Sequence, residues 1–180
     1  TQSLIIVRNG KIVMEKYQGL APSTIAAFQS AIGKDRLQLD GALDFERAWG
    51  YRGKTSLATS WSTAKSITST LIGIAIDKGY IESVDEYAST YISDWIGTKK
   101  ENSVTIKDLL EMRSGLECPA GDYGDLIYLD EDQLTPSIDR DFDETRAPNG
   151  WVYCNADTMV LGEILRNATG QSIAAFGEEN

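Results

Sequence analysis

The segment Ser62–Lys78 constrains the fold more than any other part of the sequence. Its apolar residues recur at helical spacing and cover nearly every side of a predicted helix: Ile67, Leu71, Ile72, Ile74, Ala75 and Ile76. Gly79 predicts the end of this helix. A helix that is apolar on most sides has to be buried, so we expect it to run through the core of a globular domain. The longest apolar run, Leu71–Ile76, is far shorter than the ~20 residues of a membrane span.

The charge balance and the absence of histidine exclude several functions. The 180 residues include 17 Lys and Arg against 27 Asp and Glu, a formal net charge of −10. This balance argues against a nucleic-acid partner, because contacts to phosphate depend on Lys and Arg. The sequence contains no histidine, which rules out Ser-His-Asp and Cys-His mechanisms and the usual zinc sites. Any nucleophile in this chain therefore needs a different base.

The N-terminal region is predicted to contain a β-hairpin, Ser3–Tyr17. Asn9-Gly10 separates two runs rich in β-branched residues, and both residues of this pair tolerate the positive φ of a tight turn. The following segment, Gly19–Ser60, gives weaker patterns. A short helix is expected at Thr24–Ile32 and a strand within Leu37–Tyr51.

Two further helices are predicted after the apolar one. Thr105–Arg113 begins with a Thr and an Asp three residues apart, which is the spacing of a capping box. Asp157–Ala168 has inward-facing Val, Leu and Ile residues and ends before a Thr-Gly pair. Between these helices and Ser62–Lys78, the pattern of Ile81–Tyr91 indicates a short amphipathic element.

The segment Glu117–Glu144 carries most of the negative charge. Its 28 residues include ten acids and one arginine, a net charge of −9. The spacing of Asp139, Asp141 and Asp143 invites a calcium site, but the segment lacks the glycine and glutamate that an EF-hand loop needs at its sixth and twelfth positions. We therefore expect a solvated surface loop.

The two cysteines, Cys118 and Cys154, fit neither a disulfide framework nor a metal motif. Two buried free thiols are favoured, and a single disulfide is the alternative. The cysteines therefore leave the compartment open between the periplasm or exterior and the cytoplasm.

Ser62 and Lys65 form the first candidate for catalysis. A spacing of three residues places both side chains on one face at the start of the apolar helix. A serine hydroxyl is a weak nucleophile until its proton is removed, and without histidine a lysine can remove it. The N-terminus of the helix also favours negative charge on the serine oxygen. The alternative interpretation is an N-cap serine followed by a surface lysine.

Tyr153 and Asn155 form a second candidate cluster, just before the last predicted helix. A phenol near a lysine can act as a base or a proton relay, and an asparagine amide can hold a substrate carbonyl. Taken singly, each residue has a structural interpretation, as a core aromatic for Tyr153 and a helix N-cap for Asn155.

Taken together, these motifs resemble a known family. The order Ser-x-x-Lys and then Tyr-x-Asn resembles the serine β-lactamase and penicillin-binding-protein superfamily, specifically its class C β-lactamase and esterase branch. The members most similar to this sequence are the 6-aminohexanoate-dimer hydrolase-like proteins. Four stretches carry the resemblance: Trp61–Ser66, Ile72–Tyr80, Thr105–Leu116 and Tyr153–Gly170.

The resemblance implies a role for each candidate residue. Ser62 would be the acylated nucleophile, Lys65 its proton acceptor, and Tyr153 the base or proton shuttle. Asn155 would position the substrate, which would be a small amide, ester or lactam. The implied reaction is hydrolysis through an acyl-enzyme, and it implies no cofactor or metal.

The resemblance also implies an α+β, β-lactamase-like fold with an antiparallel sheet and a helical region. Residues 1–60 would supply the hairpin and a connecting segment, and residues 61–180 the helical region. The family's third motif and its C-terminal strands are expected to be missing. Either the chain is then one piece of a longer or cleaved protein, or a complementary C-terminal chain or self-association completes the sheet, or the chain is a defective relic.

Two other readings of the sequence compete with this interpretation. Gly53-Lys54-Thr55-Ser56 resembles the family's third motif but precedes Ser62, so we treat it as coincidence. Gly53-Lys54-Thr55 also resembles the end of a nucleotide-binding P-loop, but a P-loop would need glycine where Ala48 stands, which argues against nucleotide binding. The alternative functions are a non-hydrolytic, penicillin-recognising sensor or interaction domain, and an inactive fragment.

Overall fold

The chain forms two compact units, Thr1–Trp61 and Ser62–Asn180, in a computed structural model. The structure describes the following residues: 3–19, 21, 23, 24, 26, 27, 30, 53–55, 60–118, 132–145 and 150–180. Each unit is considered by itself below. The strand expected within Leu37–Tyr51 lies outside the described residues, and the helix expected at Thr24–Ile32 lies largely outside them.

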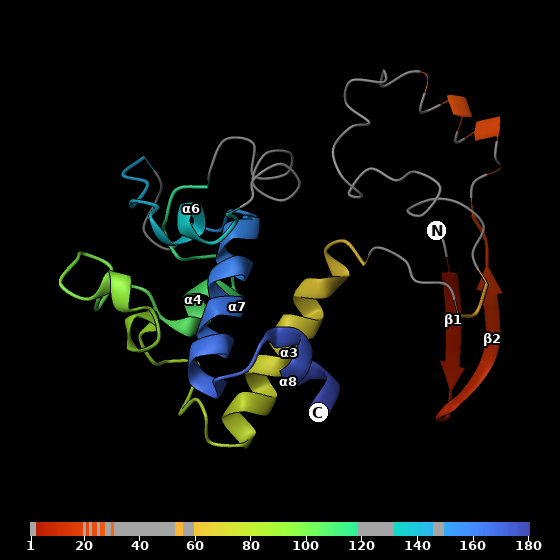
Figure 1. The fold of residues 1–180 in the computed structure, drawn as a ribbon, viewed down its shortest axis with the longest axis horizontal. Coiled ribbons are helices and arrows are strands. Elements are labelled where there is room, and N and C mark those ends of the chain that lie inside the picture. Colours follow the sequence, from red (N-terminus) through yellow and green to blue (C-terminus); the bar gives the residue numbers. More distant parts are fainter. Residues whose placement is uncertain are drawn as a thin grey trace. The chain divides into compact units, whose positions relative to one another are not determined.

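The first unit contains the predicted hairpin. Strand β1 covers Ser3–Arg8 and strand β2 covers Lys11–Tyr17, and the two pair in antiparallel register (Figure 1). The turn residues Asn9 and Gly10 have φ angles of 50° and 72°, the left-handed conformation that a two-residue hairpin turn requires. The hairpin is therefore confirmed.

The second unit is built around helix α7, which covers Asn155–Thr169. This helix confirms the one predicted at Asp157–Ala168 and begins two residues earlier. It packs against α3 (Thr63–Asp77), α4 (Ile106–Leu110), α6 (Thr135–Ile138) and α8 (Ile173–Glu179). Figure 1 shows α3 and α7 side by side. Gly170 ends α7 with a φ of 71°, a C-cap conformation in which glycine is favoured.

Helix α3 confirms the apolar helix predicted at Ser62–Lys78, but it is not buried on all sides. Its buried residues are Thr68, Leu71, Ile72 and Ala75, which lie on one face. Ile67, on another face, is 55% exposed. The expectation that this helix runs through the core is therefore confirmed only for the side that carries Leu71, Ile72 and Ala75, with Ile74 and Ile76 partly buried beside them. The central helix is α7.

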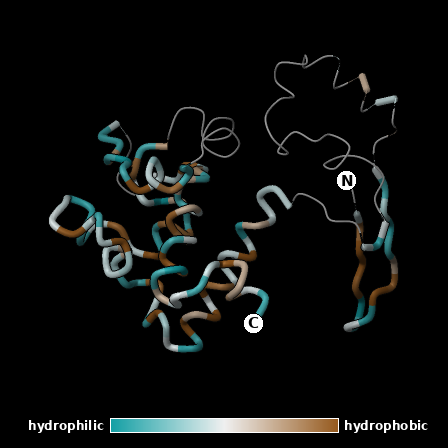
Figure 2. The backbone as a smooth tube through the Cα atoms, in the orientation of Figure 1, coloured by the Kyte–Doolittle hydropathy of each residue, from teal (hydrophilic) through white to brown (hydrophobic). Residues whose placement is uncertain are grey.

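The core lies between α3, α4, α7 and the irregular segments beside α4. Figure 2 shows the hydrophobic residues of α3 and α7 along the tube. Helix α8 was not predicted from the sequence. It closes one end of the core with Phe176, which is 2% exposed. Helices α7 and α8 approach closely at Gly162, where an added Cβ would lie 2.7 Å from Ile173 Cδ1.

The segment between α3 and α4 is mostly irregular. The amphipathic element expected at Ile81–Tyr91 contains an isolated antiparallel bridge from Tyr87 to Thr105 and a 3₁₀ turn, η2 (Ala88–Thr90). A second 3₁₀ turn, η3 (Ser93–Trp95), follows it. Trp95 is fully buried, and its Nε1 donates a hydrogen bond of 3.0 Å to the Ile138 carbonyl. That contact ties this segment to α6.

Helix α4 is shorter than predicted. Its capping box is confirmed, with Thr105 Oγ1 accepting from the Asp108 N–H and the Asp108 carboxylate accepting from the Thr105 N–H. The helix ends at Leu110, not at Arg113. Met112 then adopts a left-handed φ of 55°, which is incompatible with a continuing helix.

The acidic segment is only partly solvated, which corrects the prediction for its described residues, 117, 118 and 132–144. Ser137, Ile138 and Arg140 are buried there. The apolar Ile138 packs into the main core, and Arg140 finds acceptors in the interior. Among the described residues no group of three or more acidic or cysteine side chains could hold a metal ion. Within those residues, none of the helices is long and apolar enough to cross a membrane.

Candidate active site

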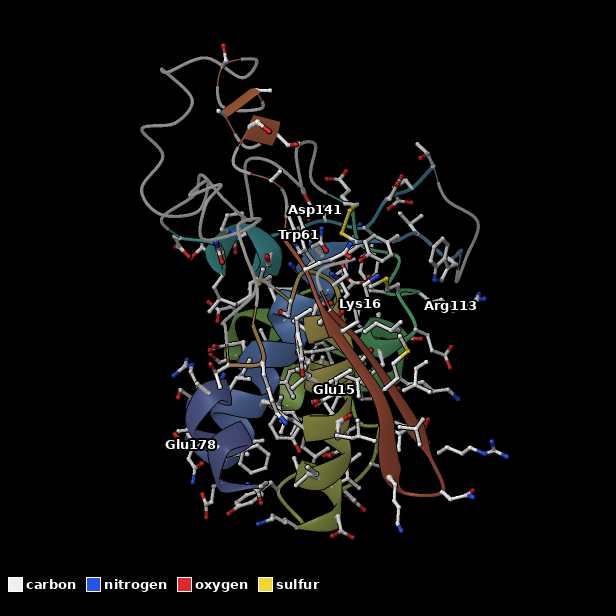
Figure 3. The ribbon with its side chains drawn as sticks, turned by 90° about the vertical axis from the view of Figure 1, so that its right-hand side faces the viewer. Glu15, Lys16, Trp61, Arg113, Asp141 and Glu178 are labelled. Carbon is white, nitrogen blue, oxygen red and sulfur yellow. A yellow bond between two sulfur atoms is a disulfide. The ribbon has the colours of Figure 1, made fainter. Side chains whose placement is uncertain are left out.

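Ser62 stands at the N-cap of α3, where the chain turns sharply into the helix. The preceding residue, Trp61 (labelled in Figure 3), has a left-handed φ of 49°. For a residue with a bulky side chain this conformation is strained, and such strain is concentrated at functional sites. The Ser62 side chain makes no cap hydrogen bond to α3 among the described residues. Its hydroxyl is thus available to other partners, and Ser62 itself is exposed.

Lys65 lies one turn further along α3. Its Nζ donates a hydrogen bond of 3.2 Å to Ser62 Oγ. It donates a second one, of 2.5 Å, to Oδ1 of Asn155 on α7. Lys65 is half-buried and is not the surface lysine of the alternative interpretation.

Tyr153 approaches the same serine from the other side. Its hydroxyl donates a hydrogen bond of 2.6 Å to Ser62 Oγ. The Lys65 Nζ lies 5.1 Å from the centroid of the Tyr153 ring, within the range of a cation–π contact. The ring also packs against the exposed Trp151, with 6.4 Å between the centroids. Tyr153 is half-buried, so it is not a core aromatic.

Asn155 is the first residue of α7 and is 2% exposed. The N-cap of α7 is Cys154, not Asn155 as the structural interpretation held. Since Asn155 is buried with its Oδ1 on the Lys65 Nζ, it fixes the position of the lysine side chain. The structure thus brings together all four residues singled out from the sequence, Ser62, Lys65, Tyr153 and Asn155.

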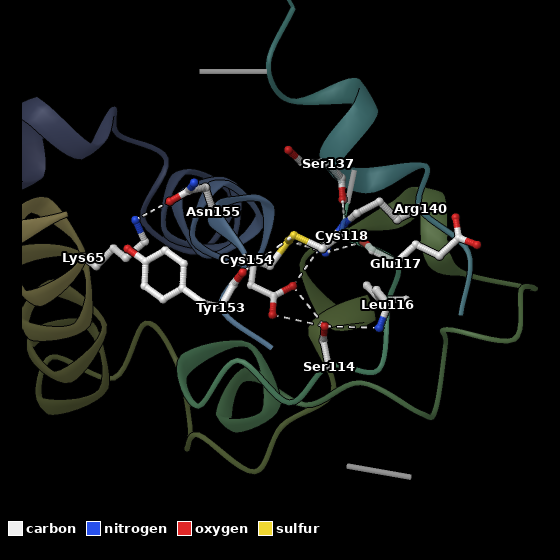
Figure 4. The surroundings of a disulfide bond; sticks show 11 residues. Lys65, Ser114, Leu116, Glu117, Cys118, Ser137, Arg140, Tyr153, Cys154 and Asn155 are labelled. Carbon is white, nitrogen blue, oxygen red and sulfur yellow. Dashed lines mark hydrogen bonds and ion pairs between the residues drawn. A yellow bond between two sulfur atoms is a disulfide. The ribbon is translucent and has the colours of Figure 1, made fainter. Parts of the chain in front are cut away.

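Cys154 forms a disulfide with Cys118, with a Cα–Cα distance of 5.7 Å. The prediction of two free thiols was therefore wrong. The two cysteines are 36 residues apart in sequence, and nothing in the local pattern predicts that the fold brings them together. Figure 4 shows the disulfide on one side of the start of α7 and Lys65, Tyr153 and Asn155 on the other.

A buried polar cluster made of Ser114, Arg140 and Asp157 lies beside the disulfide. Arg140 Nη2 is 2.8 Å from Asp157 Oδ1, with both side chains at most 3% exposed. Ser114 Oγ donates to the same carboxylate at 3.0 Å. Sequence reasoning missed this cluster. The available signal was a single arginine in an acidic segment, which is unlike a solvated acidic loop.

The geometry allows a serine-centred acyl transfer. Two proton-transfer groups, the Lys65 amine and the Tyr153 phenol, contact the Ser62 oxygen, which meets the distance criterion for general acid–base catalysis. Ser62 also lies at the positive end of the 15-residue helix α3. There the free N–H groups of the first turn favour an oxyanion.

Comparisons with known proteins identify the family and the fold of the chain. A protein-family model described as Beta-lactamase matches residues 2–180. A solved structure named "Putative 6-aminohexanoate-dimer hydrolase from Bacillus anthracis" is similar to this chain, with a TM-score of 0.58 and 20% sequence identity. The similarity covers 96% of this chain and 41% of that one. No curated protein matches the sequence significantly.

These comparisons confirm the fold class, an α+β, β-lactamase-like arrangement of a small antiparallel sheet with a helical region. The chain spans about two fifths of the length of the similar solved structure.

Proposed function

Because the chain belongs to the Beta-lactamase family, we propose that it acts as a serine hydrolase through an acyl-enzyme formed on Ser62. One observation carries this proposal. The Lys65 amine and the Tyr153 hydroxyl both lie within hydrogen-bond distance of Ser62 Oγ, although Ser62 and Tyr153 are 91 residues apart. A serine that served only to cap the helix would need neither contact.

Acylation begins with attack of Ser62 Oγ on the carbonyl carbon of the substrate. The bond between Oγ and this carbon forms as the hydroxyl proton passes to the neutral amine form of Lys65 or to the phenolate form of Tyr153. The bond from the carbon to the leaving nitrogen or oxygen then breaks, and the same proton is delivered to the leaving group. Asn155 contributes by holding the Lys65 Nζ, and its NH₂ group can donate to a substrate carbonyl.

Deacylation repeats these steps with water in place of serine. Water attacks the acyl carbon while Tyr153 or Lys65 accepts one of its protons. The ester bond to Oγ breaks, the proton returns to the serine oxygen, and a carboxylic acid leaves. Histidine is not needed at any step.

The proposed substrates are small amides or esters, with lactams as a further class. The name of the similar solved structure refers to the hydrolysis of a 6-aminohexanoate dimer, a compound whose two halves are joined by an amide bond. Trp151, which is 59% exposed and packs against Tyr153, offers an apolar surface next to the reacting groups. Such surface suits a substrate with an aliphatic chain.

Intact mass spectrometry tests the proposal. We expect a fluorophosphonate to add one label to the wild-type chain and none to Ser62→Ala. Ser66→Ala is the matched control because Ser66 is exposed one turn further along α3, and it should be labelled like the wild type. With 4-nitrophenyl acetate and benzylpenicillin, we expect an acyl adduct that turns over for at least one of them.

Three outcomes contradict the proposal. Equal labelling of Ser62→Ala would show that Ser62 is not the nucleophile. A stable penicillin adduct without turnover of either substrate would favour a penicillin-recognising sensor. The absence of any adduct in the wild type would favour an inactive fragment.

A further inference from the structure

The segment at the start of α7 supplies two of the four residues of the candidate site. Tyr153 and Asn155 supply the hydroxyl and the amide oxygen that contact Ser62 and Lys65. The hydrogen bond from the Tyr153 hydroxyl, at 2.6 Å, needs the backbone of this segment to be held in place. A displacement of about 1 Å at such a site can lower a rate by about a hundredfold.

The buried polar cluster of Ser114, Arg140 and Asp157 is well placed to hold that backbone. Asp157 lies in the first turn of α7, two residues after Asn155. Its carboxylate accepts from Ser114 Oγ at 3.0 and 3.1 Å and pairs with Arg140. A negative charge in the first turn also stabilises the helix N-terminus.

Arg140 in turn is fixed to the interior by backbone acceptors. Its Nε donates to the Ser137 carbonyl at 2.8 Å, and its Nη1 donates to the Glu117 carbonyl at 3.2 Å. Nη1 also lies 3.7 Å from the sulfur of Cys154, the residue between Tyr153 and Asn155. The guanidinium therefore connects α6 and the loop before the disulfide to the first residues of α7.

We propose that Asp157, held by Arg140 and Ser114, is a positioning residue that keeps Tyr153 on Ser62 and Asn155 on Lys65. This inference rests on the proposed function, because it assigns Asp157 a role in that reaction. Asp157 acts through the backbone of α7 and not through contact with the substrate. Its removal is expected to slow the chemical step and to leave binding of the reagent unchanged.

The test compares two substitutions on the same helix. Asp157→Asn removes the buried charge at the start of α7. The matched control is Glu163→Gln, which removes an acid that is 8% exposed and pairs with Arg166 further along α7. Labelling of Ser62 by a fluorophosphonate gives a maximal rate and a half-saturating concentration for each variant, measured at a temperature where circular dichroism shows that both are folded.

We expect Asp157→Asn to lower the maximal rate by about tenfold to a hundredfold, with a half-saturating concentration close to that of the wild type. Glu163→Gln should leave both values close to those of the wild type. A purely structural role predicts something else. Partial unfolding would reduce the fraction of protein that is labelled and leave the labelling rate of the folded fraction unchanged, and this result would overturn the proposal. Equal labelling rates for the two variants would overturn it as well.

Ser114→Ala provides a second variant if Asp157→Asn does not fold. It retains the pair of Arg140 and Asp157 and removes one hydrogen bond to the carboxylate. We expect its maximal rate to fall by at least about threefold while the fold is kept. An unchanged rate in folded Ser114→Ala would contradict the positioning role.

Nuclear magnetic resonance separates this inference from the proposed function. Lys65 lies on α3, and its backbone amide resonance should shift in Asp157→Asn, because this substitution displaces Asn155 from Lys65. If Ser114→Ala is used in place of Asp157→Asn, the same shift is expected. Glu163→Gln should leave the Lys65 resonance unchanged. If the wild type is not labelled, the proposed function fails, whatever the spectra show. If the wild type is labelled and the Lys65 resonance is the same in all variants, only the positioning role fails.

Discussion

At the scale of single residues, Ser62 and Lys65 differ from an ordinary helix start. An N-cap serine usually accepts a hydrogen bond from the N–H two or three residues later. The Ser62 oxygen is instead contacted by a lysine from its own helix and a tyrosine from a distant segment. Ser62 thus lacks a capping hydrogen bond, which typically contributes about 1 kcal/mol to the stability of a helix. This loss of stability is consistent with a functional role for the hydroxyl.

Lys65→Ala is expected to lower the rate of acylation by about 10²- to 10⁴-fold, which is the usual contribution of a general base. The fold should be retained, because Lys65 is only half-buried and is not part of the hydrophobic core. Fluorophosphonate labelling measures the rate, and circular dichroism measures the unfolding midpoint. Lys78→Ala, at the C-cap of the same helix, is the control and should be labelled like the wild type. A near-normal rate for Lys65→Ala would refute its role as proton acceptor.

The sequence could predict only part of this site. Ser62 and Lys65 are three residues apart, so helical geometry alone places them together. Tyr153 lies 91 residues from Ser62, and only the resemblance to a family links the two. The ion pair of Arg140 and Asp157 could not be predicted, because no local spacing connects the two residues and the family motif does not include them.

At the scale of elements, the start of α7 depends on the segments around it. The Cys118–Cys154 disulfide joins its N-cap to the loop after α4, and the ion pair of Arg140 and Asp157 joins its first turn to the residues after α6. The half-buried Tyr153 lies directly before this anchored N-cap. The segments that anchor the start of α7 are therefore distinct from α3, which carries Ser62 and Lys65.

Reduction of the disulfide is expected to lower the free energy of unfolding by about 2–4 kcal/mol, because the bond closes a loop of tens of residues in the unfolded chain. Urea unfolding with and without dithiothreitol measures the effect. The double variant Cys118→Ser/Cys154→Ser should already have the lower stability and should not respond to the reductant. Identical unfolding midpoints for the oxidised and reduced wild type would argue against the bond.

Elements defined by interactions between residues close in sequence could be predicted, and elements defined by tertiary contacts could not. The hairpin and the capping box were predicted because Asn9-Gly10 and the pair of Thr105 and Asp108 act locally. Helix α8 was missed because Phe176 is buried through contacts made only in the tertiary structure. The burial of α3 was overestimated because a helical pattern shows which faces are apolar and not which of them find a partner.

At the scale of the whole molecule, the unit Ser62–Asn180 is organised by α7, which contacts four other helices. The irregular segment between α3 and α4 is anchored in part by Tyr91, whose hydroxyl donates to Glu86 Oε2 at 2.9 Å. Burial, followed by this hydrogen bond and the charges of Glu86 and Glu82, raises the pKa of Tyr91 to about 12. The phenol of an unfolded chain has a pKa of about 10.

The raised pKa predicts a loss of stability in alkali. The folded state binds the phenolic proton more tightly than the unfolded state, so the full stabilisation is present below pH ~10 and is lost as the pH rises towards ~12. Urea unfolding across this range should show a falling free energy of unfolding in the wild type. Tyr91→Phe has no phenolic proton and should show a shallower decline. Equal slopes would mean that Tyr91 contributes nothing to the pH dependence.

The most direct test of the account is a double-mutant cycle on the two groups that contact Ser62. Rates of fluorophosphonate labelling are measured for the wild type, Lys65→Ala, Tyr153→Phe and the double variant. If the amine and the phenol activate the serine as one unit, the double variant should be no more than about threefold slower than the slower single variant, because residues that act together are strongly non-additive. Rates that fall by the product of the two single effects would show that the groups act independently and would contradict the account.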